Sequence, residues 1–178
     1  VAYTTLCSVC NLRFSTQQFE YCSLRAVLSA SSTMATFQRP PTEALICSLV
    51  PAAELEDVGL PTKSTFATQT PGDLPVAQRM RAAYWLKHAY DNGEDEAEKR
   101  SARRALERAA AHAPHGSLLR HECAYVLGQL RDAQAAPALQ TILCDTAEDA
   151  MLRHECAEAL GAIGEGDAVL ERLSRDAS

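Results

Sequence analysis

The chain repeats one short motif that carries chemically useful side chains. The two copies, RHECAYVLG and RHECAEALG, match at seven of nine positions and lie 33 residues apart. Each contains a histidine followed by a glutamate: His121 and Glu122 in the first copy, His154 and Glu155 in the second. Imidazole and carboxylate groups suit iron, manganese or zinc, and helical proteins use them in carboxylate-bridged two-metal centres. The motif therefore predicts these four residues as candidate metal ligands.

Helix geometry determines how such ligands could be shared. Neighbouring residues on an α-helix point about 100° apart, so His121 and Glu122 are better placed to serve two ions than one. If the two motif helices stack side by side, we expect His121 to approach His154 and Glu122 to approach Glu155 on a concave surface. Four protein ligands are too few for two ions, so a second copy of this pair of repeats would be needed to complete the site.

A plainer interpretation is that the His-Glu pairs are structural. Such pairs on helices are commonly surface ion pairs or partly buried histidines, and repeat duplication copies packing residues as readily as ligands. An earlier unit, RMRAAYWLK, has the same frame but places Met80 and Arg81 at the positions of the histidine and the glutamate. Since that version already satisfies packing, the contrast favours a role for the His-Glu pairs beyond packing.

The elements that position the motif are predicted to be helices in pairs. The 33-residue period indicates an all-α, HEAT-like α-solenoid of helical hairpins with about three repeats. Residues 135–144 are expected to form the hairpin partner of the first motif helix. The expected N-caps are Thr42, Asp73 and Ser117. The expected helices cover residues 42–50, 73–90, 94–112, 117–130, 135–144, 147–163 and 167–173.

Three regions follow from this pattern. Residues 1–33 are an unassigned extension, expected to be disordered or an artefact of the gene model, with an organelle transit peptide as the alternative. Residues 34–72 are expected to hold a short helix and a long surface loop, since prolines and glycines punctuate residues 51–72. Residues 73–178 form the repeat domain. Its charged segment, residues 94–112, is predicted to be a solvated face.

Composition excludes several classes of protein. With 47% hydrophobic and 6% aromatic residues, the chain suits packed helices. The net charge is −6 and the basic residues are interleaved with acidic ones, so we expect no nucleic-acid partner. No apolar run is long enough for a membrane span. Seven cysteines without a secretory signal argue against a disulfide framework and for a cytoplasmic protein, with Cys123 and Cys156 as packing residues.

Two segments, LLRHECAYVLGQLRDAQAAPALQTIL and MLRHECAEALGAIGEGDAVLERL, closely resemble deoxyhypusine hydroxylase, and the resemblance extends over residues 73–173. It implies HEAT-like hairpins in two similar halves, each carrying two His-Glu pairs. It also implies an iron-dependent monooxygenase that uses a non-haem di-iron centre and O₂. The substrate implied is the deoxyhypusine residue of translation initiation factor 5A, which becomes hypusine.

Carried over residue by residue, the resemblance makes His121, Glu122, His154 and Glu155 the Fe²⁺ ligands of the amino-terminal half, with each iron drawing on both halves. This sequence stops before a second half. We therefore expect it to hold half of an active site, and to be inactive unless a homodimer or a missing carboxy-terminal half completes the site.

Two glycines in the same motif are predicted to be structural. A glycine inside a helix costs about 1 kcal/mol relative to alanine. Gly128 and Gly161 are therefore expected to permit close approach of helices.

Two other classes of protein fit parts of the pattern. A non-catalytic HEAT-like interaction module would bind a protein partner on its concave surface and need no metal. A relative of HEAT-like phycobilin lyases would share the repeats, but it gives no reason for paired His-Glu.

Overall fold

The computed structural model describes residues 4–6, 13–15, 39–66 and 71–176. Two short strands, β1 (Thr4–Leu6) and β2 (Arg13–Ser15), pair in antiparallel fashion. The rest of the predicted extension, residues 1–33, lies outside the described residues. The α-helices are α3 (Thr42–Cys47), α4 (Val76–Asn92), α5 (Glu96–Ala111), α6 (Gly116–Leu130), α7 (Ala136–Cys144), α8 (Ala150–Ile163) and α9 (Asp167–Asp176).

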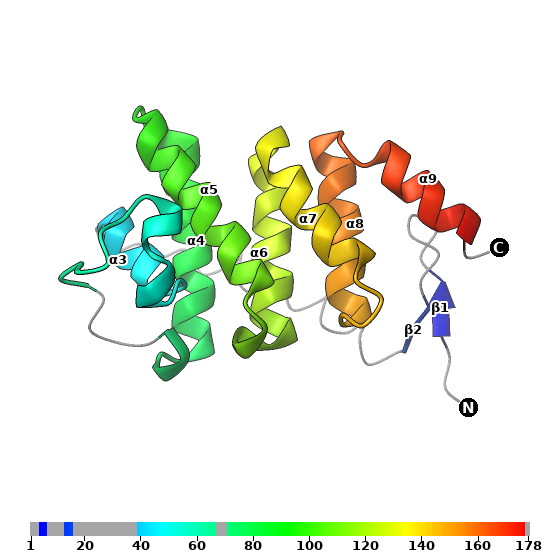
Figure 1. Cartoon of the computed structure of the whole chain (residues 1–178), viewed down its shortest axis with the longest axis horizontal. Helices are drawn as coiled ribbons and strands as arrows, with labels where there is room; N and C mark the ends of the chain where they lie inside the picture. Colours follow the sequence, from blue (N-terminus) through cyan, green and yellow to red (C-terminus); the bar gives the residue numbers. More distant parts are fainter. Residues whose placement is uncertain (1–3, 7–12, 16–38, 67–70, 177–178) are drawn as a thin grey trace, which may run out of the picture.

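The helices form a two-layered row (Figure 1). α4, α6 and α8 lie side by side in one layer, and α5 and α7 form the second layer. α3 packs at the α4 end of the row, and α9 lies at the other end. Leucines and alanines fill the space between the layers, and Leu86, Leu106, Leu127 and Leu160 are fully buried. The predicted all-α, HEAT-like solenoid of about three repeats is therefore confirmed.

The pairing of helices within the row differs from the prediction. α7 was expected to pack on α6, but it packs more closely on α8, as α5 packs on α6. Two contacts explain this arrangement. Each motif arginine, Arg120 and Arg153, bonds to the end of the helix immediately before its own. The closely packed pairs are therefore α5 with α6 and α7 with α8. In each pair, a second-layer helix precedes the helix that carries a motif.

The sequence predicted the capping residues of the helices less well than the helices themselves. The side chains that cap described helices include Asp95 on α5 and Asp149 on α8, each of which accepts bonds from backbone N–H groups two or three residues on. The three caps expected from the sequence were wrong. Thr42 is the first residue of α3 and its hydroxyl donates to Glu98, while Asp73 precedes the first residue of α4 by three residues. Ser117 lies inside α6.

The described part of residues 51–72 is not simply a surface loop. It forms three short 3-10 helices, η1 (Ala52–Glu54), η2 (Glu56–Val58) and η3 (Pro71–Asp73). Leu55 and Val58 are fully buried, and η2 packs on α5. His115 holds the turn at Leu49, just before this segment, because its Nε2–H donates to the carbonyl oxygen of Leu49 at 2.6 Å. The segment therefore closes the α3 end of the core.

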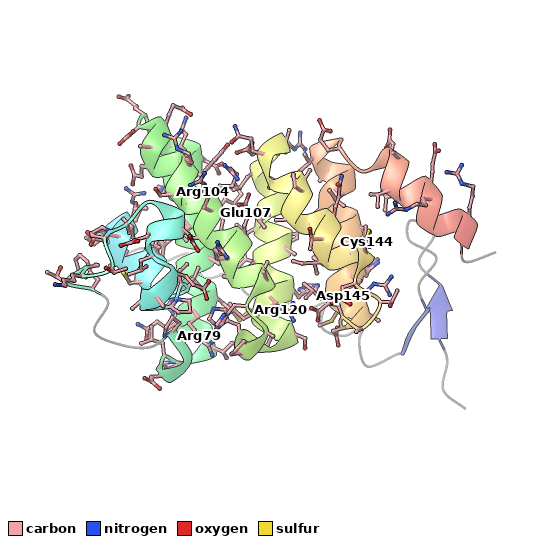
Figure 2. The ribbon with its side chains drawn as sticks, in the orientation of Figure 1. Arg79, Arg104, Glu107, Arg120, Cys144 and Asp145 are labelled. Atoms are coloured by element: carbon pink, nitrogen blue, oxygen red, sulfur yellow. The ribbon has the colours of Figure 1, made fainter. Side chains whose placement is uncertain are left out.

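The charged helix α5 is also more than a solvated face. Arg103 is 5% exposed and lies 2.9 Å from the carboxylate of Asp132. It also contacts Glu107, which is labelled in Figure 2. Tyr90 of α4 donates to the same Asp132 at 3.0 Å. This network joins α4, α5 and the start of the next repeat.

Among the helices that the structure describes, none is both long and apolar enough to cross a bilayer.

Candidate metal centre

The arginine of each repeated motif has a structural role. Arg120 Nε donates to the carbonyl of Ala110 at 2.7 Å, and Arg153 Nε donates to the carbonyl of Leu143 at 2.9 Å. Carbonyls in the last turn of a helix lack partners within that helix, so the arginines satisfy them. Arg120, labelled in Figure 2, also forms an ion pair with Glu148 just before α8. The two arginines thus fix the motif helices to their neighbours.

The cysteine of each motif is also structural. Cys123 and Cys156 are both fully buried in the core. Burial raises the pKa of each thiol to about 12, so both remain protonated and unreactive at neutral pH. The prediction that they are packing residues is confirmed.

The glycines of the motif differ from one another. A Cβ added to Gly128 would lie 2.8 Å from the Cα of Ala159, so Gly128 permits the close contact of α6 with α8, as predicted. A Cβ added to Gly161 would meet no described atom within 4 Å. The same prediction is therefore wrong for Gly161 in this chain, because no described helix packs over that position.

The histidine and glutamate of the first motif meet the glutamate of the second. His121 Nε2 lies 2.9 Å from Oε2 of Glu155, and His121 Nδ1 lies 3.5 Å from Oε1 of Glu122. The other oxygen of Glu122, Oε2, accepts a hydrogen bond from the hydroxyl of Tyr84 at 2.7 Å. His121, Glu122 and Glu155 are 6%, 8% and 2% exposed. The cluster therefore lies between α6 and α8, nearly closed to solvent.

The two carboxylates determine the charge of His121. Burial is the largest single influence on its pKa and lowers it, but the contacts and charges of Glu122 and Glu155 together raise the pKa to about 9. The imidazole is therefore protonated at neutral pH in the arrangement described, and its positive charge offsets part of the negative charge buried beside it.

His154 of the second motif has a different environment. Its Nε2 lies 3.1 Å from Oε1 of Glu158, one turn further along α8, and its side chain is more exposed than that of His121. The sequence predicted that His121 would approach His154 and that Glu122 would approach Glu155. In the structure, Glu122 and Glu155 both contact His121. The approach of His121 to His154 stays a prediction. The structure thus brings His121, Glu122 and Glu155 together and gives His154 a glutamate of its own helix.

The cluster fits a metal ion of the iron type in kind but not in number. Imidazole and carboxylate are ligands that iron, manganese and zinc accept. Nδ1 of His121 is buried, and its contact with Oε1 of Glu122, at 3.5 Å, is too long for an ordinary hydrogen bond, which is unusual for a buried polar atom. In the described part of the chain, however, no three His, Cys, Asp or Glu side chains are grouped so that they could hold one ion.

Sequence reasoning missed two residues of this site, Tyr84 and Glu158. Both stand five residues after the first arginine of their unit, since Tyr84 follows Arg79 and Glu158 follows Arg153. Alignment of the three units in this frame is the signal that could have drawn attention to the position.

Comparison with known proteins first supports the fold described above. The family model described as HEAT repeats matches residues 108–177, which include both motifs. Together with the two-layered row of helices, this match agrees with an all-α, HEAT-like solenoid.

Curated relatives then identify a more specific similarity. A deoxyhypusine hydroxylase of Coccidioides immitis is 47% identical over 74 residues, which are 42% of this chain and 22% of the relative. Deoxyhypusine hydroxylase-B of Oryza sativa is 43% identical over 71 residues, 40% of this chain and 20% of the relative. A Candida glabrata deoxyhypusine hydroxylase is 37% identical over 116 residues, 65% of this chain and 35% of the relative. The resemblance to deoxyhypusine hydroxylase is confirmed.

A solved structure of human deoxyhypusine hydroxylase in complex with glycerol also matches, with 32% sequence identity and a TM-score of 0.49. The match covers 76% of this chain and 40% of that chain. The chain thus spans between about a fifth and two fifths of the length of these relatives.

Proposed function

We propose that this chain is the amino-terminal part of a deoxyhypusine hydroxylase, a cytoplasmic monooxygenase. Its substrate would be the deoxyhypusine residue of translation initiation factor 5A, which it would hydroxylate to hypusine with O₂. The observation that carries the proposal is the buried cluster of His121, Glu122 and Glu155. This cluster lies within residues 108–177, which match the family model described as HEAT repeats, and the chain is similar to deoxyhypusine hydroxylases.

The proposed Fe²⁺ ligands are His121, Glu122, His154 and Glu155. A di-iron centre, when bound, would supply the oxygen activation that hydroxylation of a carbon–hydrogen bond requires. The chain would hold the ligands on two adjacent helices, and Glu122 and Glu155 would offset the charge of the cations. His121 must give up its proton before it can act as a ligand, so binding should release protons. The α6–α8 contact would keep bulk water from the buried side of the site.

The remaining ligands must come from outside the two motifs. Two irons need more protein groups than these four residues supply, and the described residues add no further group able to hold an ion. Either a carboxy-terminal half or a second copy of the chain in a homodimer would provide an equivalent set. In the homodimer, the iron content and the hydroxylase activity would both rise as the dimer forms.

The first test is iron content per chain, measured with the molar mass in solution on the same sample of the 178-residue protein. About one iron per chain in a dimer would support a site rebuilt by self-association. Absence of iron at every protein concentration, including concentrations at which the chain is dimeric, would overturn the proposal that this chain forms the centre by itself.

A pair of glutamate variants tests the ligand assignment. Glu122→Gln keeps the side-chain size but removes the charge, so iron content and hydroxylation should fall at least tenfold. Helix content should change little. Glu171→Gln is the matched control, because Glu171 is exposed on α9 and pairs only loosely with Arg175, at 3.9 Å. Iron retained in Glu122→Gln would contradict the assignment.

The non-catalytic interaction module makes the opposite prediction. It requires no iron, and replacing His121 and His154 together with alanine would leave binding of a protein partner unchanged. That result, with a wild-type chain that takes up no iron, would favour the module over the hydroxylase.

A further inference from the structure

Tyr84 connects the repeat without a His-Glu pair to the metal centre. It lies on α4, which packs directly against α6. Its hydroxyl donates to Oε2 of Glu122 at 2.7 Å, within the usual range for an O–H···O bond. The first repeat, which has Met80 and Arg81 in place of the pair, thus still contributes a polar contact to the site.

This bond makes the two oxygens of Glu122 different. Oε2 accepts from Tyr84, while Oε1 lies 3.5 Å from Nδ1 of His121. A carboxylate can turn about its last side-chain bond, and a donor fixed on a neighbouring helix opposes that rotation. Tyr84 therefore determines which oxygen of Glu122 is directed toward His121.

We propose that Tyr84 is a positioning residue, which orients the carboxylate of Glu122 for metal binding. This inference rests on the proposed function. Hydrogen bonds to ligating carboxylates hold their geometry and tune their strength as ligands, so loss of such a bond typically costs about 10-fold to 100-fold in metal affinity. The tyrosine acts through Glu122 and does not itself bind the metal.

The repeat frame gives independent support. Tyr84 stands five residues after Arg79, and Tyr125 stands five residues after Arg120. Tyr84 contacts the glutamate of the next motif helix, so the same step from Tyr125 leads to Glu155. A tyrosine therefore stands at this position in two of the three units.

The third unit departs from this frame in an informative way. It has Glu158 at the position of the two tyrosines, and Glu158 forms an ion pair with His154. Even with a different side chain, this position contacts a member of a His-Glu pair. In two of the three units, the side chain at this position thus contacts a proposed ligand.

The experiment compares Tyr84→Phe with Tyr90→Phe in the full chain. Tyr90 lies on the same helix and also donates to a carboxylate, that of Asp132, which is not a proposed ligand. Cobalt(II) serves as the probe, because its ligand-field absorption reports its own coordination. Tyr84→Phe should weaken cobalt(II) affinity about tenfold and shift the absorption bands. Tyr90→Phe should leave both unchanged, although it removes one hydrogen bond from the fold.

Cobalt(II) affinity and spectrum equal to wild type in Tyr84→Phe would overturn the inference. If the wild-type chain binds no cobalt(II) and no iron, the proposal that this chain forms the centre by itself fails, and crystal structures of the chelator-treated proteins decide the role of Tyr84. A Glu122 carboxylate that turns away from its wild-type position in Tyr84→Phe supports positioning. An unmoved carboxylate overturns it.

Discussion

His121 shows how the charge of one residue depends on side chains from two helices. Its sequence neighbour Glu122 supplies one carboxylate, and Glu155 supplies the other from the next repeat. The candidate ligands could be predicted because residue type and period are written in the sequence. The contact of His121 with Glu155 could not, because it depends on how far α8 is shifted along α6, and side-chain spacing within one helix does not determine that shift.

The raised pKa of His121 predicts a pH-dependent stability in chelator-treated protein. Below the ordinary pKa of 6.5 both folded and unfolded chains are protonated, so the ion pairs contribute fully. As the pH rises from 6.5 through about 9, the unfolded chain releases its proton first and stability falls. The total loss should be about 3 kcal/mol. Urea unfolding between pH 6 and pH 10 measures it.

His121→Gln should remove this slope, whereas His88→Gln, at an exposed position on α4, should keep it. The difference between the wild-type and variant curves isolates His121 from the other titrating groups. Parallel curves for wild type and His121→Gln would show that the buried pair does not form in solution.

At the scale of elements, helices were predicted better than their ends. Apolar periodicity indicates a helix over many residues, and each predicted helix exists. A cap depends on a single side chain that has competing partners. The hydroxyl of Thr42, for example, bonds Glu98 far along the chain, and Asp149 caps α8 within a run of several polar residues. Sequence alone does not rank such alternatives.

The contact between α6 and α8 provides a test at this scale. Gly128→Ala places a methyl group 2.8 Å from the Cα of Ala159, so the two backbones must separate. The expected loss of stability is about 1–3 kcal/mol. Gly161→Ala is the matched control, since its methyl meets no described atom and should stabilise α8 by about 0.5–1 kcal/mol. Thermal or urea unfolding of both variants gives the signs, and a stabilising Gly128→Ala would contradict the packing described.

At the scale of the whole molecule, α4, α6 and α8 each contact their neighbours in the same layer. α4 packs on α6, and α6 packs on α8. The sequence predicted this solenoid because a fixed period requires a repeated packing unit. It assigned α7 to the wrong neighbour, because adjacency in sequence does not show which face of a helix is covered more closely.

Nearest-neighbour packing predicts that damage at one end stays local. Leu160 of α8 is fully buried, and Leu160→Ala should cost about 2–5 kcal/mol. Hydrogen exchange followed by mass spectrometry should show protection lost first in α7 and α8, and last in α4 and α5. Uniform loss of protection across all helices would instead indicate that the described chain unfolds as one cooperative unit.

The two arginine contacts also limit which insertions and deletions the chain can accept. Arg120 and Arg153 each reach a carbonyl ten residues earlier, across a different connecting segment. Adding one residue to either segment would move the carbonyl away from its arginine, or turn the motif helix by about 100° and carry its histidine out of the cluster. Length changes in these two connections are therefore far less acceptable than substitutions. In descendants of this gene, their sequences can drift while their lengths stay fixed.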